Sequence, residues 1–154
     1  MKDSSSPASK HQVTARTKAR RRAVEVLFEA DQRGLESTQA LRDLSAERVV
    51  TSANHTQAPE YTRTILTGVC DHIDDIDSVL ASHSQQWSLD RMPAVDRAIA
   101  RVAVWEILFN DEVDGPVAVD EAMTLARLLS TDDSPRFLNG LLGRIADLSD
   151  TIAV

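Results

Sequence analysis

Residues 61–80, YTRTILTGVCDHIDDIDSVL, decide the fold class of this chain. Large apolar side chains recur in this stretch at steps of three and four, the spacing that places side chains on one face of an α-helix. The spacing continues over the whole segment and predicts a single helix of about six turns. The side chains that form this apolar stripe are Tyr61, Ile65, Val69, Ile73, Ile76 and Leu80.

The same spacing returns three times in the residues that follow. Pro93 suits the first turn of a long helix, whose pattern ends at the loop signal NDEVDGP, residues 110–116. A second helix is expected to open at Pro116, and a third with Ser134 as its N-cap and Pro135 in its first turn. The apolar positions are Val95, Ile99, Val102, Ala103, Trp105, Ile107 and Phe109 in the first, Val119, Met123, Ala126 and Leu129 in the second, and Phe137, Leu141, Ile145 and Leu148 in the third.

Before residue 61, a helical pattern begins at about Thr14 and ends at Gly34, a residue that commonly terminates helices. A shorter amphipathic piece follows around Leu41 and Leu44, and TSANHTQAP then forms a connecting loop. The first dozen residues are polar and rich in serine, so they cannot offset the entropy lost on ordering. We therefore expect residues 1–13 to form a disordered tail.

The fold class follows from these patterns together. No stretch alternates between apolar and polar residues for long enough to form a strand, and no repeat of fixed period occurs. Only 4% of the 154 residues are aromatic although 42% are hydrophobic, so the core must consist mainly of aliphatic side chains, as is typical of packed helices. The sequence predicts an all-α protein with one compact domain.

Charge is distributed unevenly along the chain. The net charge of −7 would by itself disfavour a nucleic-acid partner. However, seven of the 17 Lys and Arg residues and one of the 24 acidic residues lie in residues 1–22, so this segment carries +6 and the remainder −13. The basic part is therefore a candidate surface for a polyanion.

The densest basic stretch runs from Arg16 to Arg22. Arg16 and Arg20 are four residues apart and align with Val24, the first core residue of the same helix. Because an arginine is almost never buried unpaired, this end of the helix should overhang the protein body or face a negatively charged partner. An alternative is that the acidic body supplies internal salt bridges. Arginine suits phosphate and base edges, and an arginine-rich segment is typical of RNA binding.

Three stretches of this chain resemble the NusB family of bacterial transcription antitermination factors. They are ARTKARRRAVEVLFEAD (15–31), YTRTILTGV (61–69), and the C-terminal half with WSLDRMPAVDRAIARVAVWEIL (87–108) and VAVDEAMTLARLLSTDDSPRFLNGLLGRI (117–145). The resemblance implies about seven helices in two small bundles packed into one unit, at about 14–83 and 87–150 within a domain spanning 14–150. It also implies single-stranded boxA RNA of ribosomal RNA leaders and the ribosomal protein NusE as partners, within the antitermination complex on RNA polymerase.

The resemblance further implies which residues contact RNA. By position, the basic start of the first helix carries that role over to Arg16, Lys18 and Arg20, while Arg21 is an additional cation at a place where the family need not be basic. A second RNA surface is implied at DSPRFLNG, residues 133–140.

The physical chemistry of this second surface agrees with that role. Free backbone N–H groups at a helix start attract phosphate, Arg136 adds charge, Asn139 can hydrogen-bond a base edge, and Phe137 could stack on a base. Each residue also has an ordinary structural explanation. Phe137 has the spacing of a core residue, and Gly140 could serve close packing.

For the protein partner, the resemblance places the NusE surface on the C-terminal half, where Asp96 and Glu106 offer carboxylates to a basic protein. A different hypothesis makes the chain an interaction module whose basic segment forms a homo-oligomer interface, with Arg16 and Arg20 paired to acids of a second subunit. A homodimer is compatible with either interpretation.

Enzymatic function is not expected. The chain has no phosphate-binding glycine loop, nucleophile elbow, paired cysteines or HExxH motif. The acidic run from Asp71 to Asp77 places Asp71 and Asp75 on one helix face but lacks a second histidine at ligand spacing, which is typical of a solvated face. We expect no cofactor and no metal. With a lone cysteine, no signal peptide and no apolar run of membrane length, the expected location is the cytoplasm.

Overall fold

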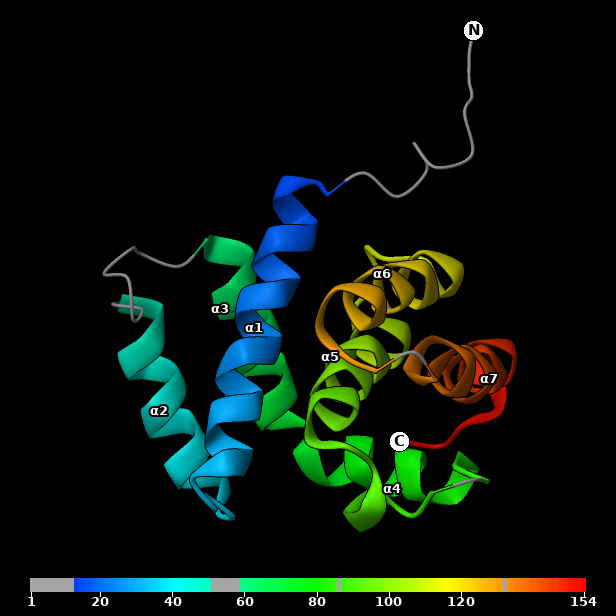
Figure 1. Ribbon diagram of the computed structural model, residues 1–154, viewed down its shortest axis with the longest axis horizontal. Helices are drawn as coiled ribbons and strands as arrows, with labels where there is room; N and C mark the ends of the chain where they lie inside the picture. Colours follow the sequence, from blue (N-terminus) through cyan, green and yellow to red (C-terminus); the bar gives the residue numbers. More distant parts are fainter. Residues whose placement is uncertain (1–12, 51–58, 86, 132) are drawn as a thin grey trace, which may run out of the picture.

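The computed structural model describes residues 13–50, 59–85, 87–131 and 133–154, and the regular secondary structure within these ranges is all helical (Figure 1). The all-α prediction is confirmed. The predicted tail, residues 1–13, lies outside the described residues apart from Val13. The helices are α1 (Ala15–Gln32), α2 (Thr38–Val50), α3 (Glu60–Asp71), α4 (Ile73–His83), α5 (Ala94–Phe109), α6 (Gly115–Leu129) and α7 (Ser134–Asp147), with the short 3-10 turns η2 (Leu89–Arg91) and η3 (Ser149–Thr151).

The ends of α1 lie where the sequence predicts them. Thr14 is the N-cap: its hydroxyl accepts a hydrogen bond from the Thr17 backbone N–H, and the Thr17 hydroxyl accepts one from the Thr14 backbone N–H. This reciprocal capping satisfies two backbone donors that a helix start otherwise leaves free. Gly34 follows the helix with φ of 68°, in the left-handed region that glycine adopts without strain.

The expectation of one long helix over residues 61–80 is wrong. The helix is interrupted at His72, so that α3 ends at Asp71 and α4 begins at Ile73. The His72 ring stacks on Phe109 of α5, with centroids 3.9 Å apart. The apolar spacing from Val69 through Ile73 continues across the break, because both helices bury their apolar faces in the same core. A one-residue break therefore leaves no mark in the periodicity.

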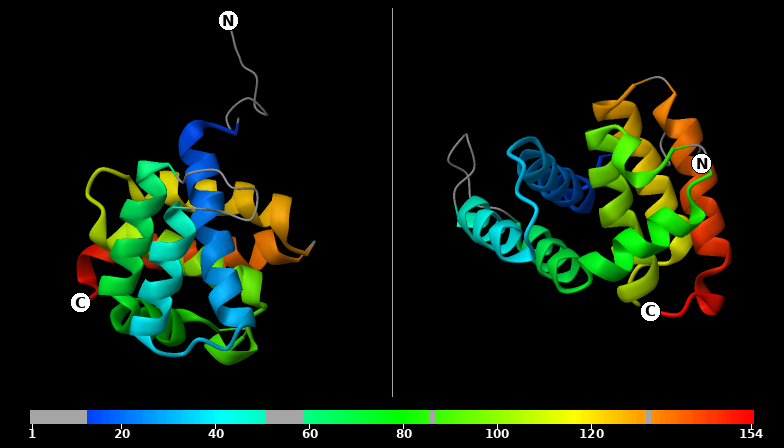
Figure 2. Two further views of the ribbon diagram at one scale, coloured as in Figure 1. Left: turned by 90° about the vertical axis from the view of Figure 1, so that its left-hand side faces the viewer. Right: turned by 90° about the horizontal axis from the view of Figure 1, so that it is seen from below.

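Helices α1, α2 and α3 pack together on one side of the molecule, and α5, α6 and α7 on the other (Figures 1 and 2). Helix α5 contacts α1 and α3 as well as α6 and α7, so it joins the two groups. Helix α4 packs mainly on α5 and α7. The division into bundles at about 14–83 and 87–150 stays a prediction, and the contacts of α4 favour a boundary nearer His72.

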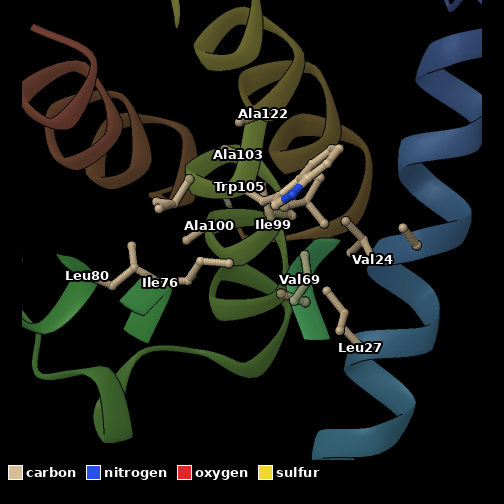
Figure 3. Packing of buried hydrophobic residues seen from close by; sticks show 14 of the residues in the cluster. Val24, Leu27, Val69, Ile76, Leu80, Ile99, Ala100, Ala103, Trp105 and Ala122 are labelled. Atoms are coloured by element: carbon tan, nitrogen blue, oxygen red, sulfur yellow. The ribbon is translucent and has the colours of Figure 1, made fainter. Parts of the chain in front are cut away.

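The core where α3 crosses α5 depends on a glycine. A Cβ atom built on Gly68 would lie 2.0 Å from Nε1 of Trp105, so only glycine allows the two helices to approach this closely. Around this crossing, aliphatic side chains from five helices fill the space (Figure 3). They include Val24 and Leu27 of α1, Val69 of α3, Ile76 and Leu80 of α4, Ile99 of α5 and Ala122 of α6. None of the described helices is long and apolar enough to span a membrane.

Candidate nucleic-acid interface

The basic start of α1 divides into exposed and buried cations. Arg16, Lys18 and Arg21 are exposed to solvent, whereas the whole of Arg20 is only 5% exposed. Arg21 pairs with the exposed Glu25 at 3.4 Å. Such a surface ion pair contributes little to stability and leaves the cation able to exchange partners. Arg16, Lys18 and Arg21 can therefore meet a ligand in solution.

Arg20 is engaged inside the protein. Its Nε donates to both carboxylate oxygens of Glu106, at 3.0 and 2.8 Å, and its Nη1 donates to Glu121 at 2.9 Å. Burial by itself would lower the pKa of the guanidinium, but the two carboxylates outweigh it, so that the pKa of Arg20 lies above its usual value. The predicted overhang is wrong for this residue, and the alternative of an internal salt bridge applies.

Two further side chains extend this buried network, which holds the start of α1 on α3, α5 and α6. The Tyr61 hydroxyl of α3 donates to Glu106, and the Thr17 hydroxyl of α1 donates to Glu121 at 2.8 Å. Burial and the hydrogen bond to Glu106 raise the pKa of Tyr61 to about 12. The network fixes the direction of α1, and with it the positions of the exposed cations.

Arg16 lies on the outer side of the same network. Its Cζ is 3.9 Å from the centroid of the Tyr61 ring, a close cation–π contact. Within the described parts of the chain, Arg16 has no carboxylate partner. The surface is hollowed on both sides of it: a cavity of about 410 Å³ lies toward α3 and α5, and one of about 480 Å³ toward the start of α6.

The second predicted RNA surface, at the start of α7, is exposed in part. Arg136 and Asn139 are exposed, but Phe137 is 7% exposed and its ring packs against Trp87, with centroids 4.6 Å apart. Phe137 is thus a core residue, which removes the expectation that it stacks on a base. Gly140 is exposed and a Cβ there would meet only Arg144 Nη1 at 3.5 Å, so close packing does not explain this glycine.

Ser134 is not the N-cap of α7 as expected. It is the first residue of the helix, fully buried, and its hydroxyl donates to Asp96 at 2.8 Å. Asp133 occupies the N-cap position without a side-chain cap hydrogen bond. The Asp96 carboxylate also accepts from Ser130, and so links the start of α5 to both ends of the α6–α7 connection.

The two carboxylates predicted to contact NusE are both buried. Asp96 is 0% and Glu106 1% exposed, and their partners are Ser130 and Ser134 in one case and Arg20 and Tyr61 in the other. The expectation of exposed carboxylates is therefore wrong. The reason is that each oxygen of the two carboxylates accepts a hydrogen bond from inside the protein, which makes burial tolerable.

The first and last acids of the run of residues 71–77 likewise have structural partners. Asp71 accepts from Arg42 at 2.7 Å, and Asp77 receives two hydrogen bonds from Arg101, at 2.8 and 2.9 Å. Among the described residues, no group of three or more His, Cys, Asp or Glu side chains is placed to hold a metal ion.

Sequence reasoning did not identify Tyr61 and Glu121 as parts of the site. Helical spacing places Tyr61 in an apolar stripe, and Glu121 belongs to no distinguishing motif. One signal pointed toward them: Arg20 continues the core stripe of α1, and a buried arginine requires carboxylates from other elements.

This chain is similar to known proteins along nearly its whole length. A model of the NusB family matches residues 17–147. The transcription antitermination protein NusB of Kineococcus radiotolerans is 50% identical over 143 residues, covering 92% of this chain and 99% of that protein.

Solved structures show the same similarity in three dimensions. NusB of T. maritima superposes with a TM-score of 0.70 at 31% identity, over 87% of this chain and 92% of that one. A chain from the complex of antitermination factors NusB and NusE with dsRNA has a TM-score of 0.67 at 26% identity, over 86% and 96%.

Proposed function

This chain belongs to the NusB family, and from that premise we propose that it binds single-stranded boxA-type RNA together with NusE. In this role it acts as a transcription antitermination factor for ribosomal RNA, in the complex on RNA polymerase. The related complex of NusB and NusE with dsRNA supports both partners. The family resemblance likewise supports a non-enzymatic role.

The observation that carries RNA binding is the set of exposed cations around the start of α1. Three exposed cations, Arg16, Lys18 and Arg21, lie on a helix whose direction is fixed by buried ion pairs, in a protein whose net charge is −7. Fixed cations reach phosphates with less loss of entropy than cations on a flexible segment. Arg20, in contrast, acts as the anchor of this helix and stabilises the surface without contacting RNA.

The start of α7 supplies the second part of the RNA surface. Arg136 can pair with phosphate, and the Asn139 amide can donate to and accept from a base edge. Arg136 and Asn139 are exposed. Gly140 beside them has no side chain and few neighbouring atoms, so an RNA strand can approach the helix closely. Helix α6 packs against both α1 and α7, the two helices that carry the proposed RNA contacts.

NusE remains a proposed partner, but its contacts must lie on residues other than Asp96 and Glu106, because both are buried. The rival hypothesis of a homo-oligomer interface, which paired Arg16 and Arg20 with acids of a second subunit, loses one of its two arginines. Arg20 finds its carboxylates in its own chain and needs none from a second subunit. Self-association stays a separate prediction.

A fluorescence anisotropy titration tests the proposal, using a boxA-type RNA and a scrambled RNA of the same length. The variant Arg16→Ala/Lys18→Ala/Arg21→Ala is expected to bind both RNAs at least about 10-fold more weakly, because phosphate contacts carry no sequence information. The variant Asn139→Ala should lose affinity mainly for the boxA-type RNA.

The matched control removes three exposed cations away from both proposed RNA surfaces, Arg33→Ala/Arg63→Ala/Arg91→Ala, and changes the net charge by the same amount. It should bind like the wild type. If both triple variants lose affinity equally, the effect is one of overall charge and the proposed surface is wrong.

A further inference from the structure

The guanidinium of Arg16 is held in a defined place. It contacts the ring of Tyr61, whose hydroxyl donates to Glu106 and accepts from Asn110 Nδ2 at 3.2 Å. The ring of Tyr61 is therefore held in place, because its hydroxyl both donates and accepts a hydrogen bond. Because Arg16 is itself exposed, one side of its guanidinium lies against the ring while the rest can meet a ligand.

A cavity of about 410 Å³ opens beside this pair, with aromatic and polar walls. Tyr61, Trp105 and Phe109 form its aromatic part, and Asn110 forms part of the polar wall. This volume lies in the range of pockets that enclose small molecules, about 300–1,000 Å³. The cavity is thus large enough for one planar ring system.

The polar groups of the cavity favour a neutral ring over a phosphate. Glu60 and Glu112 lie at its wall, and their carboxylates repel phosphate. The Asn110 amide uses one N–H on Tyr61 and accepts from the Glu112 backbone N–H at 3.0 Å, which leaves its second N–H for another acceptor. A nucleobase carries such acceptors, and bases of single-stranded RNA commonly stack on arginine planes.

We propose that one unstacked nucleobase of the bound RNA enters this cavity and stacks on Arg16, with Tyr61 as the positioning residue for the guanidinium. This inference rests on the proposed RNA binding and adds base recognition at the α1 start, where the exposed charges by themselves imply only phosphate contacts.

The experiment is an abasic scan of a boxA-type RNA against the full chain. Each nucleotide in turn is replaced by an abasic one, and the affinity of every RNA is measured for the wild type, Arg16→Lys, Tyr61→Phe and Tyr61→Leu. Loss of a stacked base lowers affinity roughly 5- to 150-fold. We expect a loss of that size at the nucleotide that occupies the cavity.

The variants identify this position. Arg16→Lys keeps the charge but lacks the planar group. In this variant, the abasic nucleotide at the cavity position should no longer lower the affinity. The salt dependence of binding to the unmodified RNA should stay the same. Tyr61→Phe keeps the ring, so the same abasic nucleotide should still lower its affinity. In Tyr61→Leu, which lacks the ring, it should not. Arg16 is exposed, so its substitution tests the inference even if Tyr61→Leu does not fold.

Tryptophan fluorescence gives an independent measurement. In a Trp87→Phe background, Trp105 is the remaining tryptophan and borders the cavity. Binding of the unmodified RNA should change the emission of Trp105. Binding of the RNA that is abasic at the cavity position should leave this emission unchanged.

The outcomes separate the inference from the proposed function. If the wild type binds the unmodified RNA but every abasic penalty is the same in Arg16→Lys, Arg16 contacts phosphate only and the inference is wrong. If the wild type does not bind the unmodified RNA, the proposed function is wrong and the inference with it.

Discussion

Replacement of Arg20 by methionine separates an anchoring role from an RNA contact. The guanidinium bonds Glu106 and Glu121, whose side chains are 1% and 12% exposed. Methionine fills a similar volume but leaves these carboxylates without their cation. Removing one partner of a buried ion pair costs about 3–5 kcal/mol, because the remaining charge stays desolvated. We expect Arg20→Met to lower the free energy of unfolding by this amount.

Urea unfolding followed by circular dichroism measures this loss, and an RNA titration of the folded protein completes the test. A domain of this size has a free energy of unfolding of about 5–15 kcal/mol, so the folded variant should remain measurable. Arg21→Met is the matched control: its side chain is 48% exposed, and its loss should cost less than about 1 kcal/mol.

A second substitution tests the stated cause. Arg20→Met/Glu106→Gln removes the carboxylate of Glu106 that Arg20→Met leaves without its cation. Because the two side chains are in direct contact, the effects of the two changes are coupled, and the double variant should be more stable than Arg20→Met. The reasoning fails if Arg20→Met costs less than about 1 kcal/mol and weakens RNA binding as much as Arg16→Ala does.

Three further predictions concern single residues. Gly68→Ala places a Cβ against Trp105 and should destabilise the protein by about 1–3 kcal/mol in urea unfolding; an unchanged midpoint would contradict the close approach of α3 and α5. Gly140→Ala meets no crowding within α7 and should stabilise it by up to about 1 kcal/mol, so a loss of stability would indicate an unrecognised contact. Tyr61 is the only tyrosine of the chain, so absorbance at 295 nm should give a midpoint near pH 12 in the folded protein and near 10 in urea. Because the folded pKa is raised, the folded state holds this proton more tightly, so stability should fall between these two pH values, and it should fall less in Tyr61→Phe.

The helices could be predicted from the sequence because each has an apolar face at helical spacing. The start of α1 at Thr14 and its end at Gly34 also followed from local rules of capping. The break at His72 could not be predicted in the same way, since the apolar spacing of α3 continues into α4 and only the tertiary packing separates the two helices.

The candidate site was harder to predict from the sequence, because its contacts join distant parts of the chain. Arg20 lies 86 residues from Glu106 and 101 from Glu121, and no local pattern links them. The burial of Asp96 has the same origin, since its partners Ser130 and Ser134 come from the α6–α7 connection. Charge and helical spacing identified the exposed cations correctly but could not distinguish them from the buried one.

The salt dependence of RNA affinity tests the central claim most directly. Four exposed cations, Arg16, Lys18, Arg21 and Arg136, are proposed to contact phosphates. Each contact with single-stranded RNA contributes a slope of about −0.7 to log affinity against log salt, so the wild type should show about −3. Arg16→Ala/Lys18→Ala/Arg21→Ala should show about −1. Equal slopes in the two proteins would contradict the assignment of the α1 start as the RNA-binding surface.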